Sequence, residues 1–223
     1  MAKPMAPEPK FFRIDSLYER GLGYYAATWF DGLGARVLGE KSTSYLEEPR
    51  VAGRMHRDLP DVRLIFILRD PVERAWSNYC WSRHNGLETE SFAYAIAHED
   101  ERAVPERLRD TRPFSYVARG RYADLLAPYF ALFPRDRILV LKFEDLRQGA
   151  APLTARVHRF IGVAERPGDA DGMGVVNPAQ GADQGMPEAC RRRLTELFAE
   201  SNRDLERLVL QDFSAWRGDD GHR

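Results

Sequence analysis

The clearest pattern of apolar and polar positions in the chain spans Val62–Trp81. The apolar run Leu64–Leu68 is short and unbroken, which predicts a parallel strand buried on both faces rather than an alternating surface strand. Asp70 then stands where a helix N-cap belongs, with Pro71 as the first helical residue and Glu73 as the third-position partner of a capping box. The pattern therefore predicts a buried strand, a tight turn and a well-specified helix.

This helix has two stripes of side chains at helical spacing. The core-facing stripe comprises Val72, Ala75, Trp76, Tyr79 and Cys80, and the neighbouring stripe comprises Arg74, Ser77, Asn78 and Trp81. Arg69 is the first polar residue beyond the strand, so Arg69 and Ser77 are expected to face one crevice. In open α/β sheets ligands bind beyond the carboxyl ends of the strands, and helix N-termini attract anions, so this pair suits a phosphate. The alternative is that Arg69 only pairs with Asp70 or Glu73.

The rest of the chain alternates short apolar runs with helical patterns, which predicts a three-layer α/β domain with a central parallel sheet, a single domain over residues 1–223. Helices are expected over Leu17–Phe30, Glu48–Leu59, Ser91–Ala103, Tyr116–Phe133 with a break at Gly120, Glu144–Gln148, Pro152–Ile161 and Pro187–Leu210, the last as one bent helix or two. Further strands are expected over Arg36–Gly39 and Arg137–Phe143. The glycine-rich stretch Arg166–Gly185 is long for a loop of a compact domain, and such loops are usually functional or disordered.

Composition narrows the function classes. With 43% hydrophobic residues, 30% charged residues and a formal net charge of -1, the chain is an ordinary globular sequence without a field for nucleic acid or an acidic membrane. Its two cysteines form no disulfide framework, its first residues lack the apolar core of a signal peptide, and no apolar run approaches the roughly 18 residues of a membrane span. We therefore predict a cytoplasmic protein that binds neither nucleic acid nor membrane.

Several charged residues carry no predicted chemistry. The acidic patch His98–Asp100 is expected to face outward, and Arg191–Arg193 is expected to form a solvated helix face. The histidines, His56, His84, His98, His158 and His222, show no metal-ligand spacing, so no metal is predicted. Lysine is rare beside arginine, which makes Lys41, just after the predicted strand Arg36–Gly39, a candidate point charge.

A phosphate-binding loop of the nucleotide triphosphatase type is disfavoured. Gly34, Gly39, Lys41 and Ser42 approach the pattern G-x-x-x-x-G-K-[ST], but Glu40 stands where glycine is needed directly before lysine. An acid there would repel the phosphates that the backbone donors should hold. We therefore do not expect a kinase of this type.

Six segments occur in an order and spacing that resemble one family. They are EPKFF, GLGYY, GEKSTSYL, RLIFILRDPVERAWSNY, GRYADLLAPYFALFP and ILVLKFEDL. With them the chain resembles the sulfotransferases that use 3'-phosphoadenosine 5'-phosphosulfate (PAPS), especially the branch that contains the heparan sulfate sulfotransferase domains and many bacterial enzymes. The most specific segment is R-D-P-x-x-R-x-x-S at Arg69–Ser77. The resemblance implies a P-loop-like sulfotransferase fold.

The resemblance also implies roles for four residues. Arg69 and Ser77 would bind the 3'-phosphate of PAPS, Lys41 would lie near the transferred sulfuryl group, and Glu8 would be the general base. Phe11 and Phe12 are expected to anchor the segment that carries Glu8, although a solvated Glu8 near a terminus is the simpler interpretation of the residues alone. Lys10 stands where several relatives have histidine, and the loop Met173–Gly185 lies where relatives close over the cofactor, so both roles stay open.

The beginning of the chain departs from the family. Relatives open with a strand, a small-residue loop with lysine and Ser/Thr that holds the 5'-phosphosulfate, and a helix, and none of these precedes EPKFF here. We therefore expect a sheet without its first strand, in a fragment, a chain with a misplaced start, or a degenerate member. Residues 1–223 alone are accordingly expected to transfer poorly.

The leading hypothesis is a sulfotransferase that moves a sulfuryl group from PAPS to a hydroxyl or amine of a small-molecule or glycan acceptor, without a metal. The alternative is a non-catalytic relative that binds adenosine 3',5'-bisphosphate or a partner. Acceptor pockets are built from variable loops, so the sequence leaves the acceptor open. It also leaves the oligomeric state open, a homo-oligomer included.

Overall fold

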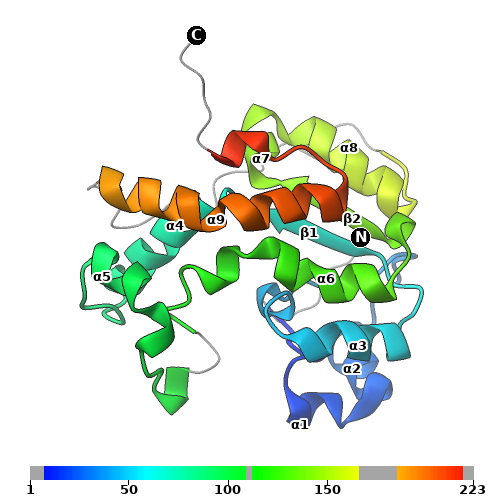
Figure 1. Ribbon diagram of the computed structural model, residues 1–223. Coiled ribbons are helices and arrows are strands. Elements are labelled where there is room, and N and C mark those ends of the chain that lie inside the picture. Colours follow the sequence, from blue (N-terminus) through cyan, green and yellow to red (C-terminus); the bar gives the residue numbers. More distant parts are fainter. Residues whose placement is uncertain (1–7, 109–111, 166–184, 218–223) are drawn as a thin grey trace. The chain divides into compact units, whose positions relative to one another are not determined.

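A computed structural model describes residues 8–108, 112–165 and 185–217 of the chain (Figure 1). The strands β1 (Leu64–Leu68) and β2 (Ile138–Lys142) form a two-stranded parallel sheet, and the remaining elements are helices and turns. Both strands lie where their continuous apolar runs predict them. The predicted α/β class is confirmed, and the expectation that the sheet lacks the first strand of the family stays a prediction.

The described residues form two compact units, each built from separate stretches of chain. The first comprises 8–66, 125–140 and 149–165, and the second 67–108, 112–124, 141–148 and 185–217. The first holds α1 (Asp15–Tyr18), α2 (Gly21–Trp29), α3 (Pro49–Asp58) and α8 (Ala150–Ile161). The second holds α4 (Pro71–His84), α5 (Phe92–Ala97), α7 (Phe143–Gln148) and α9 (Glu188–Val209). Helix α6 (Tyr122–Leu132) begins in the second unit and ends in the first. A single domain over 1–223 stays a prediction.

Strand β1 differs from its prediction in burial. Leu64 and Leu68 are buried, but Ile65 is 36% exposed and Ile67 is 53% exposed. Side chains alternate between the faces of a strand, so one face of β1 packs into the core and the other is open to solvent in the described residues. The prediction of burial on both faces is therefore wrong for β1. It is confirmed for Ile138, Val140 and Leu141 in β2, which are all buried.

Helix α4 begins directly beyond β1, and its first turn is fixed by carboxylates. The Asp70 side chain accepts hydrogen bonds from the backbone N–H of Val72 at 2.8 Å and of Glu73 at 3.4 Å, which confirms it as the N-cap. Glu73 does not complete the predicted capping box. Instead Glu144, two residues beyond β2 in α7, accepts a hydrogen bond from the Asp70 N–H at 2.9 Å. A carboxylate from the end of the neighbouring strand thus replaces the local partner.

The core of the second unit assembles on the predicted stripe of α4. Its buried members are Val72, Ala75, Phe92, Ala95, Ile96, Tyr116, Cys190, Leu194 and Phe198, with Trp76, Tyr79 and Leu197 partly buried against them. Burying each large apolar side chain contributes about 1.5–3 kcal/mol. Helix α9 runs without interruption along this core, so the last helical pattern forms one helix rather than two. Both cysteines are buried and free.

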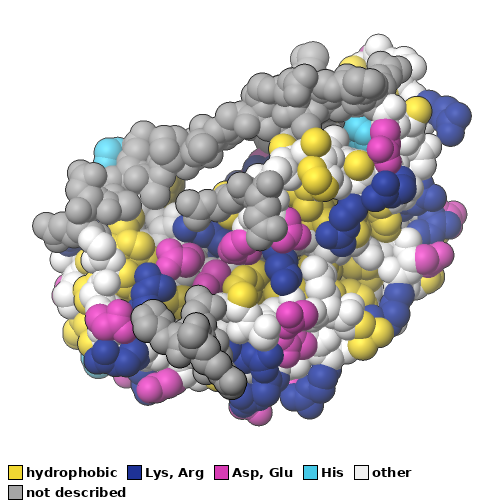
Figure 2. Space-filling model, turned by 90° about the horizontal axis from the view of Figure 1, so that it is seen from above, with side chains coloured by type: hydrophobic (Ala, Val, Ile, Leu, Met, Phe, Trp, Pro, Cys, Tyr) yellow, Lys and Arg dark blue, Asp and Glu magenta, His cyan; other side chains and the backbone are white. Residues whose placement is uncertain are grey.

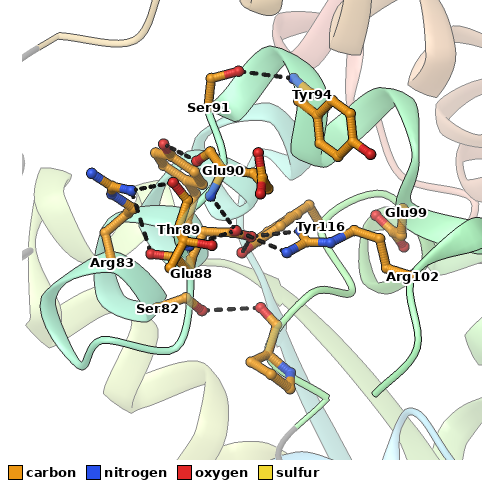
Figure 3. A network of polar contacts seen from close by, with 12 residues as sticks. Ser82, Arg83, Glu88, Thr89, Glu90, Ser91, Tyr94, Glu99, Arg102 and Tyr116 are labelled. Atoms are coloured by element: carbon orange, nitrogen blue, oxygen red, sulfur yellow. Dashed lines mark hydrogen bonds and ion pairs between the residues drawn. The ribbon is translucent and has the colours of Figure 1, made fainter. Parts of the chain in front are cut away.

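A buried carboxylate ties together the segments that follow α4 (Figure 3). The side chain of Glu88 is fully buried and accepts hydrogen bonds from both terminal nitrogens of Arg102, at 2.6 and 2.8 Å, and from the Tyr116 hydroxyl at 2.7 Å. Burial alone would raise the pKa of Glu88, but the donors Arg102 and Tyr116 outweigh it and lower that pKa. Breaking such a buried pair typically costs about 3–5 kcal/mol, so the network fixes where Tyr116 lies.

Tyr116 in turn fixes the backbone beside the polar stripe of α4. Arg74 donates to the carbonyl oxygen of Tyr116, and Asn78 donates to that of Pro113 at 3.3 Å. Glu99 accepts hydrogen bonds from the backbone N–H of Val117 at 2.5 Å and of Ala118 at 2.9 Å, although its triplet was expected to face outward. The prediction for Glu99 is therefore wrong, because its carboxylate satisfies donors at the start of the turn 118–120.

Two predicted helices differ in extent from those of the structure, and one predicted strand does not form. The helix expected over Leu17–Phe30 is divided into α1 and α2 at Gly21, whose φ of +77° lies in the left-handed region. The strand expected over Arg36–Gly39 does not form, and only Leu38, 46% exposed, makes a single bridge. The helix expected over Ser91–Ala103 ends at Ala97 in α5. Beyond α5, Glu99–Glu101 form a separate 3-10 helix.

Two glycine substitutions should change stability in opposite directions. A Cβ at Gly120 would lie 2.5 Å from the buried Phe198 ring and 3.0 Å from the Pro71 Cβ, so Gly120→Ala should overpack the core and cost about 1–3 kcal/mol. Gly53 lies inside α3, and nothing approaches its Cβ position within 4 Å. Gly53→Ala should therefore add about 0.5–1 kcal/mol by restricting the unfolded chain. Urea unfolding of the two variants measures both effects, and a stable Gly120→Ala protein would refute the close approach.

Candidate functional site

The first unit brings Glu8 and Lys41 together. Lys41 Nζ lies 3.1 Å from Glu8 Oε1, and the Thr43 hydroxyl donates to the two carboxylate oxygens at 3.0 and 3.2 Å. Burial alone would raise the pKa of Glu8, but the hydrogen bonds from Lys41 and Thr43 together outweigh it and hold that pKa below its ordinary value. Glu8 is therefore a charged carboxylate at neutral pH. The Lys41 side chain is 73% exposed, so it can also reach a ligand.

Glu40, which the sequence marks only as a residue that spoils a phosphate loop, lies behind this pair in a cluster of hydroxyls. The Ser42 hydroxyl donates to Glu40 Oε2 at 3.0 Å and the Tyr25 hydroxyl to Oε1 at 3.4 Å. Burial raises the pKa of Glu40, and the nearby charge of Glu8 adds to that rise. Sequence reasoning missed the Glu40 carboxyl because one of its partners, Tyr25, comes from the separate helix α2, while the other, Ser42, follows Glu40 by two residues.

The segment that carries Glu8 is held by its aromatic residues and by Ser42. Phe11 and Phe12 are fully buried and anchor this segment as predicted, with Phe11 stacked on Tyr25 and Phe12 edge-on to it. The backbone N–H of Lys10 donates to the Ser42 hydroxyl at 2.9 Å. Lys10 has a φ of 52°, a left-handed conformation that costs a residue other than glycine about 1–2 kcal/mol. The structure thus keeps a strained turn directly beside Glu8, and such strain often accompanies functional sites.

The second unit holds Arg69 and Ser77. Arg69 follows β1, and its backbone carbonyl accepts a hydrogen bond from the Tyr122 hydroxyl at 2.9 Å. Its side chain is 34% exposed and lies over the Phe143 ring at 5.7 Å. Its nearest carboxylate is Glu73, with 3.9 Å between Arg69 Nη2 and Glu73 Oε2, so the alternative pairing with Glu73 is present but loose.

Glu73 has a closer partner than Arg69. Arg191 Nη1 of α9 lies 2.7 Å from Glu73 Oε1. Arg191 is 42% exposed, as the predicted solvated face requires, but it also forms an ion pair that the sequence did not indicate. Ser77 follows Glu73 by four residues, which places both on one side of α4. Within the described residues, no hydrogen bond engages the Ser77 hydroxyl, so it can accept or donate to a ligand.

Carboxylates crowd the start of α4. Burial raises the pKa of Asp70 to about 6, with Glu73 and Glu144 adding to the rise and the two helix N–H donors opposing it. The second oxygen of Glu144, Oε2, is buried without a hydrogen-bond partner in the described part of the chain. Sequence reasoning missed Glu144. Its place two residues after β2 was a signal, because parallel strands end at one edge of a sheet.

Positive and negative side chains are mixed on the face that Figure 2 shows. Figure 2 shows Lys and Arg side chains interspersed with Asp and Glu on the visible face, in keeping with the net charge of -1. In residues 8–108, 112–165 and 185–217, no group of three or more His, Cys, Asp and Glu side chains is arranged to hold a metal ion. Over the same residues, no helix has both the length and the apolar composition that crossing a bilayer requires. The loop Met173–Gly185 lies outside the described residues apart from Gly185.

Comparison with known proteins points to one family. A family model described as "Sulfotransferase domain" matches residues 53–172, which include Arg69 and Ser77. Human heparan sulfate glucosamine 3-O-sulfotransferase 6 is 30% identical over 232 residues, which cover 95% of this chain and 65% of that protein. The bifunctional heparan sulfate N-deacetylase/N-sulfotransferase of Drosophila melanogaster is 29% identical over 170 residues, 69% of this chain and 16% of that protein. The matched part of this chain thus spans 65% of the length of the first relative and 16% of the length of the second.

A solved structure has the same fold. The crystal structure of a sulfotransferase from Alicyclobacillus acidocaldarius superposes with a TM-score of 0.77 at 29% sequence identity, covering 96% of this chain and 87% of that chain. The match extends over nearly all of this chain, and it therefore includes the segments on both sides of residues 53–172.

The raised pKa of Asp70 should make stability depend on pH. Because folding raises this pKa from 3.8 to about 6, the folded state holds the proton more tightly, and stability should fall as the pH rises through that window. Asp70→Asn removes the titration and keeps an oxygen that can cap α4. Between about pH 4 and pH 7, wild type should lose up to roughly 2 kcal/mol more than the variant in urea unfolding. Equal losses would show that Asp70 titrates normally.

Proposed function

Because this chain belongs to the sulfotransferase family, we propose that it transfers a sulfuryl group from PAPS to a hydroxyl or amine of a small-molecule or glycan acceptor. The observation that carries the proposal is the 3.1 Å contact between Glu8 and Lys41, a carboxylate and a cation from distant segments at one place. The names of the heparan sulfate relatives favour a glycan acceptor over other classes. A cytoplasmic location stays a prediction.

The residues of the first unit suit in-line transfer. The acceptor oxygen or nitrogen attacks the sulfur of PAPS, a new bond to sulfur forms, and the bond between sulfur and the 5'-phosphate oxygen breaks. Glu8 takes the proton of the acceptor, and adenosine 3',5'-bisphosphate leaves with the electron pair of the broken bond. Lys41 steadies the charge that develops on the departing phosphate, as cations do in phosphoryl transfer. The lowered pKa of Glu8 keeps it ionised, as a base must be.

The residues of the second unit suit the 3'-phosphate. A phosphate needs a cation and hydrogen-bond donors, and here Arg69 is only loosely paired while the Ser77 hydroxyl is available. The positive end of the α4 dipole favours an anion at the same place. The carboxylates Asp70, Glu73 and Glu144 lie close by and would repel a phosphate. The positive charge of Arg69 is therefore essential for phosphate binding.

Arg69 should distinguish nucleotides by their 3'-phosphate. Wild type is expected to bind adenosine 3',5'-bisphosphate more tightly than adenosine 5'-monophosphate, and to melt at a higher temperature in its presence. Arg69→Ala should lower the affinity for the bisphosphate by about tenfold or more, because a charge-assisted contact is lost, and should leave the affinity for the monophosphate unchanged. Isothermal titration calorimetry with both nucleotides measures this. An Arg69→Ala protein that keeps its fold and its preference for the bisphosphate would eliminate the assignment.

Glu8 should be required for turnover but not for nucleotide binding. Removing a general base typically lowers the rate about 10²- to 10⁴-fold, so Glu8→Gln should lose PAPS-dependent transfer while binding adenosine 3',5'-bisphosphate as wild type does. The matched control is Glu19→Gln, since Glu19 is an exposed glutamate of the same unit. Undiminished turnover in Glu8→Gln would move the base elsewhere, with Lys10 next. Nucleotide binding by wild type without transfer to any glycan or small-molecule acceptor would favour the non-catalytic alternative.

A further inference from the structure

We propose that Arg191 is a positioning residue of the nucleotide site, which holds Glu73 away from Arg69 so that Arg69 is available to the 3'-phosphate. The inference rests on the proposed function and adds a residue of α9 to it. Its basis is one carboxylate shared unequally by two arginines. Glu73 lies 2.7 Å from Arg191 and 3.9 Å from Arg69.

Glu73 lies between Arg69 and Ser77 along the chain, beside the position proposed for the phosphate. Arg69 precedes α4, Glu73 lies in its first turn, and Ser77 follows one turn later on the same side of the helix. A phosphate that contacts both Arg69 and Ser77 therefore passes beside the Glu73 carboxylate. Like charges at such a distance repel, and an arginine already paired with a carboxylate offers less to a ligand. Some group has to neutralise Glu73 and turn it aside.

Arg191 is placed to do this by the packing of α9. Leu194 and Phe198 are fully buried in the core that includes Val72 and Ala75 of α4, which fixes the two helices side by side. Arg191 lies one turn before Leu194, and it reaches Glu73 at a distance typical of a strong charge-assisted contact. Because α9 is anchored by these apolar contacts, Arg191 does not have to move when the nucleotide binds or leaves.

The neighbouring arginine offers a matched control. Arg192 stands next to Arg191, but it points to Glu188 of its own helix at 3.6 Å, and both of those side chains are 67% exposed. A change at Arg192 removes the same charge from the same helix without touching Glu73. A general effect of net charge on nucleotide affinity would therefore appear in both Arg191→Gln and Arg192→Gln. The proposed effect would appear only in Arg191→Gln.

The test is a double-mutant cycle on the preference for adenosine 3',5'-bisphosphate over adenosine 5'-monophosphate, measured by calorimetry on the full chain. Arg191→Gln should reduce this preference about three- to fivefold, because Glu73 then pairs with Arg69, while Arg192→Gln should leave it unchanged. Glu73→Gln should raise the preference. In the Glu73→Gln background, Arg191→Gln should have no further effect, since the charge it controls is gone.

The outcomes separate this inference from the function on which it rests. If wild type shows no preference for the bisphosphate, the 3'-phosphate site is wrong, and the inference falls with it. If wild type has the preference and Arg191→Gln keeps it in full, only the inference is overturned. If Arg191→Gln weakens the preference equally in both backgrounds, Arg191 acts on the nucleotide directly, and the positioning role is refuted. Melting temperatures of each variant show whether loss of folding accounts for any change.

Discussion

The hydrogen bonds at Asp70 are the constraint on which the candidate nucleotide site depends. Its carboxylate accepts from the first N–H groups of α4, and its own N–H donates to Glu144 at the end of β2. Two strand ends and a helix start are thereby held at one place, with Arg69 directly before the cap. Burial raises the pKa of Asp70, and the nearby carboxylates Glu73 and Glu144 add to the rise. The geometry of the site is maintained against electrostatic repulsion.

The negative charge of these carboxylates makes the nearby cations Arg69 and Arg191 important for binding an anion. Asp70, Glu73 and Glu144 lie close to the proposed phosphate site and would repel an anion, so under the proposal its affinity comes from directed contacts with Arg69 and Ser77. Arg191 fits this picture as a counterion fixed on a separate, firmly packed helix. Specificity for a nucleotide follows when neutralisation is local and geometric rather than a broad positive field.

The first unit shows the same physics in a pair of carboxyls. Glu8 contacts Lys41, Glu40 directly precedes Lys41 in the chain, and the pKa values of the two glutamates shift in opposite directions. Glu8 gains a lysine and a hydroxyl donor and stays ionised, whereas Glu40 is more deeply buried among hydroxyls and is easier to protonate. Environments that separate two carboxyls in this way are a common basis for assigning acid and base roles. The assignment of Glu8 as the base agrees with that separation.

The sequence by itself determined the elements whose signals are local. Residues Leu64–Leu68 are an unbroken apolar run that can only be a short strand or a helix segment, and the Asp70–Pro71 turn ends it and starts α4 through hydrogen bonds made within three residues. The buried stripe of α4 followed from the same kind of local pattern. The motif segments also predicted Arg69, Ser77, Glu8 and Lys41 as candidates through their resemblance to a family.

Only the tertiary structure decided how side chains from distant segments are paired. Glu144 replaces Glu73 as the hydrogen-bond acceptor of the Asp70 N–H, and Glu73 lies closer to Arg191 than to Arg69. The Glu99 carboxylate points inward to the start of the 118–120 turn. In each case the partner is far away in the sequence, and a charged residue on an amphipathic helix carries no local mark of whether it meets water or a counterion. The open face of β1 was equally hidden, because burial depends on which element covers a face and not on the strand's own residues.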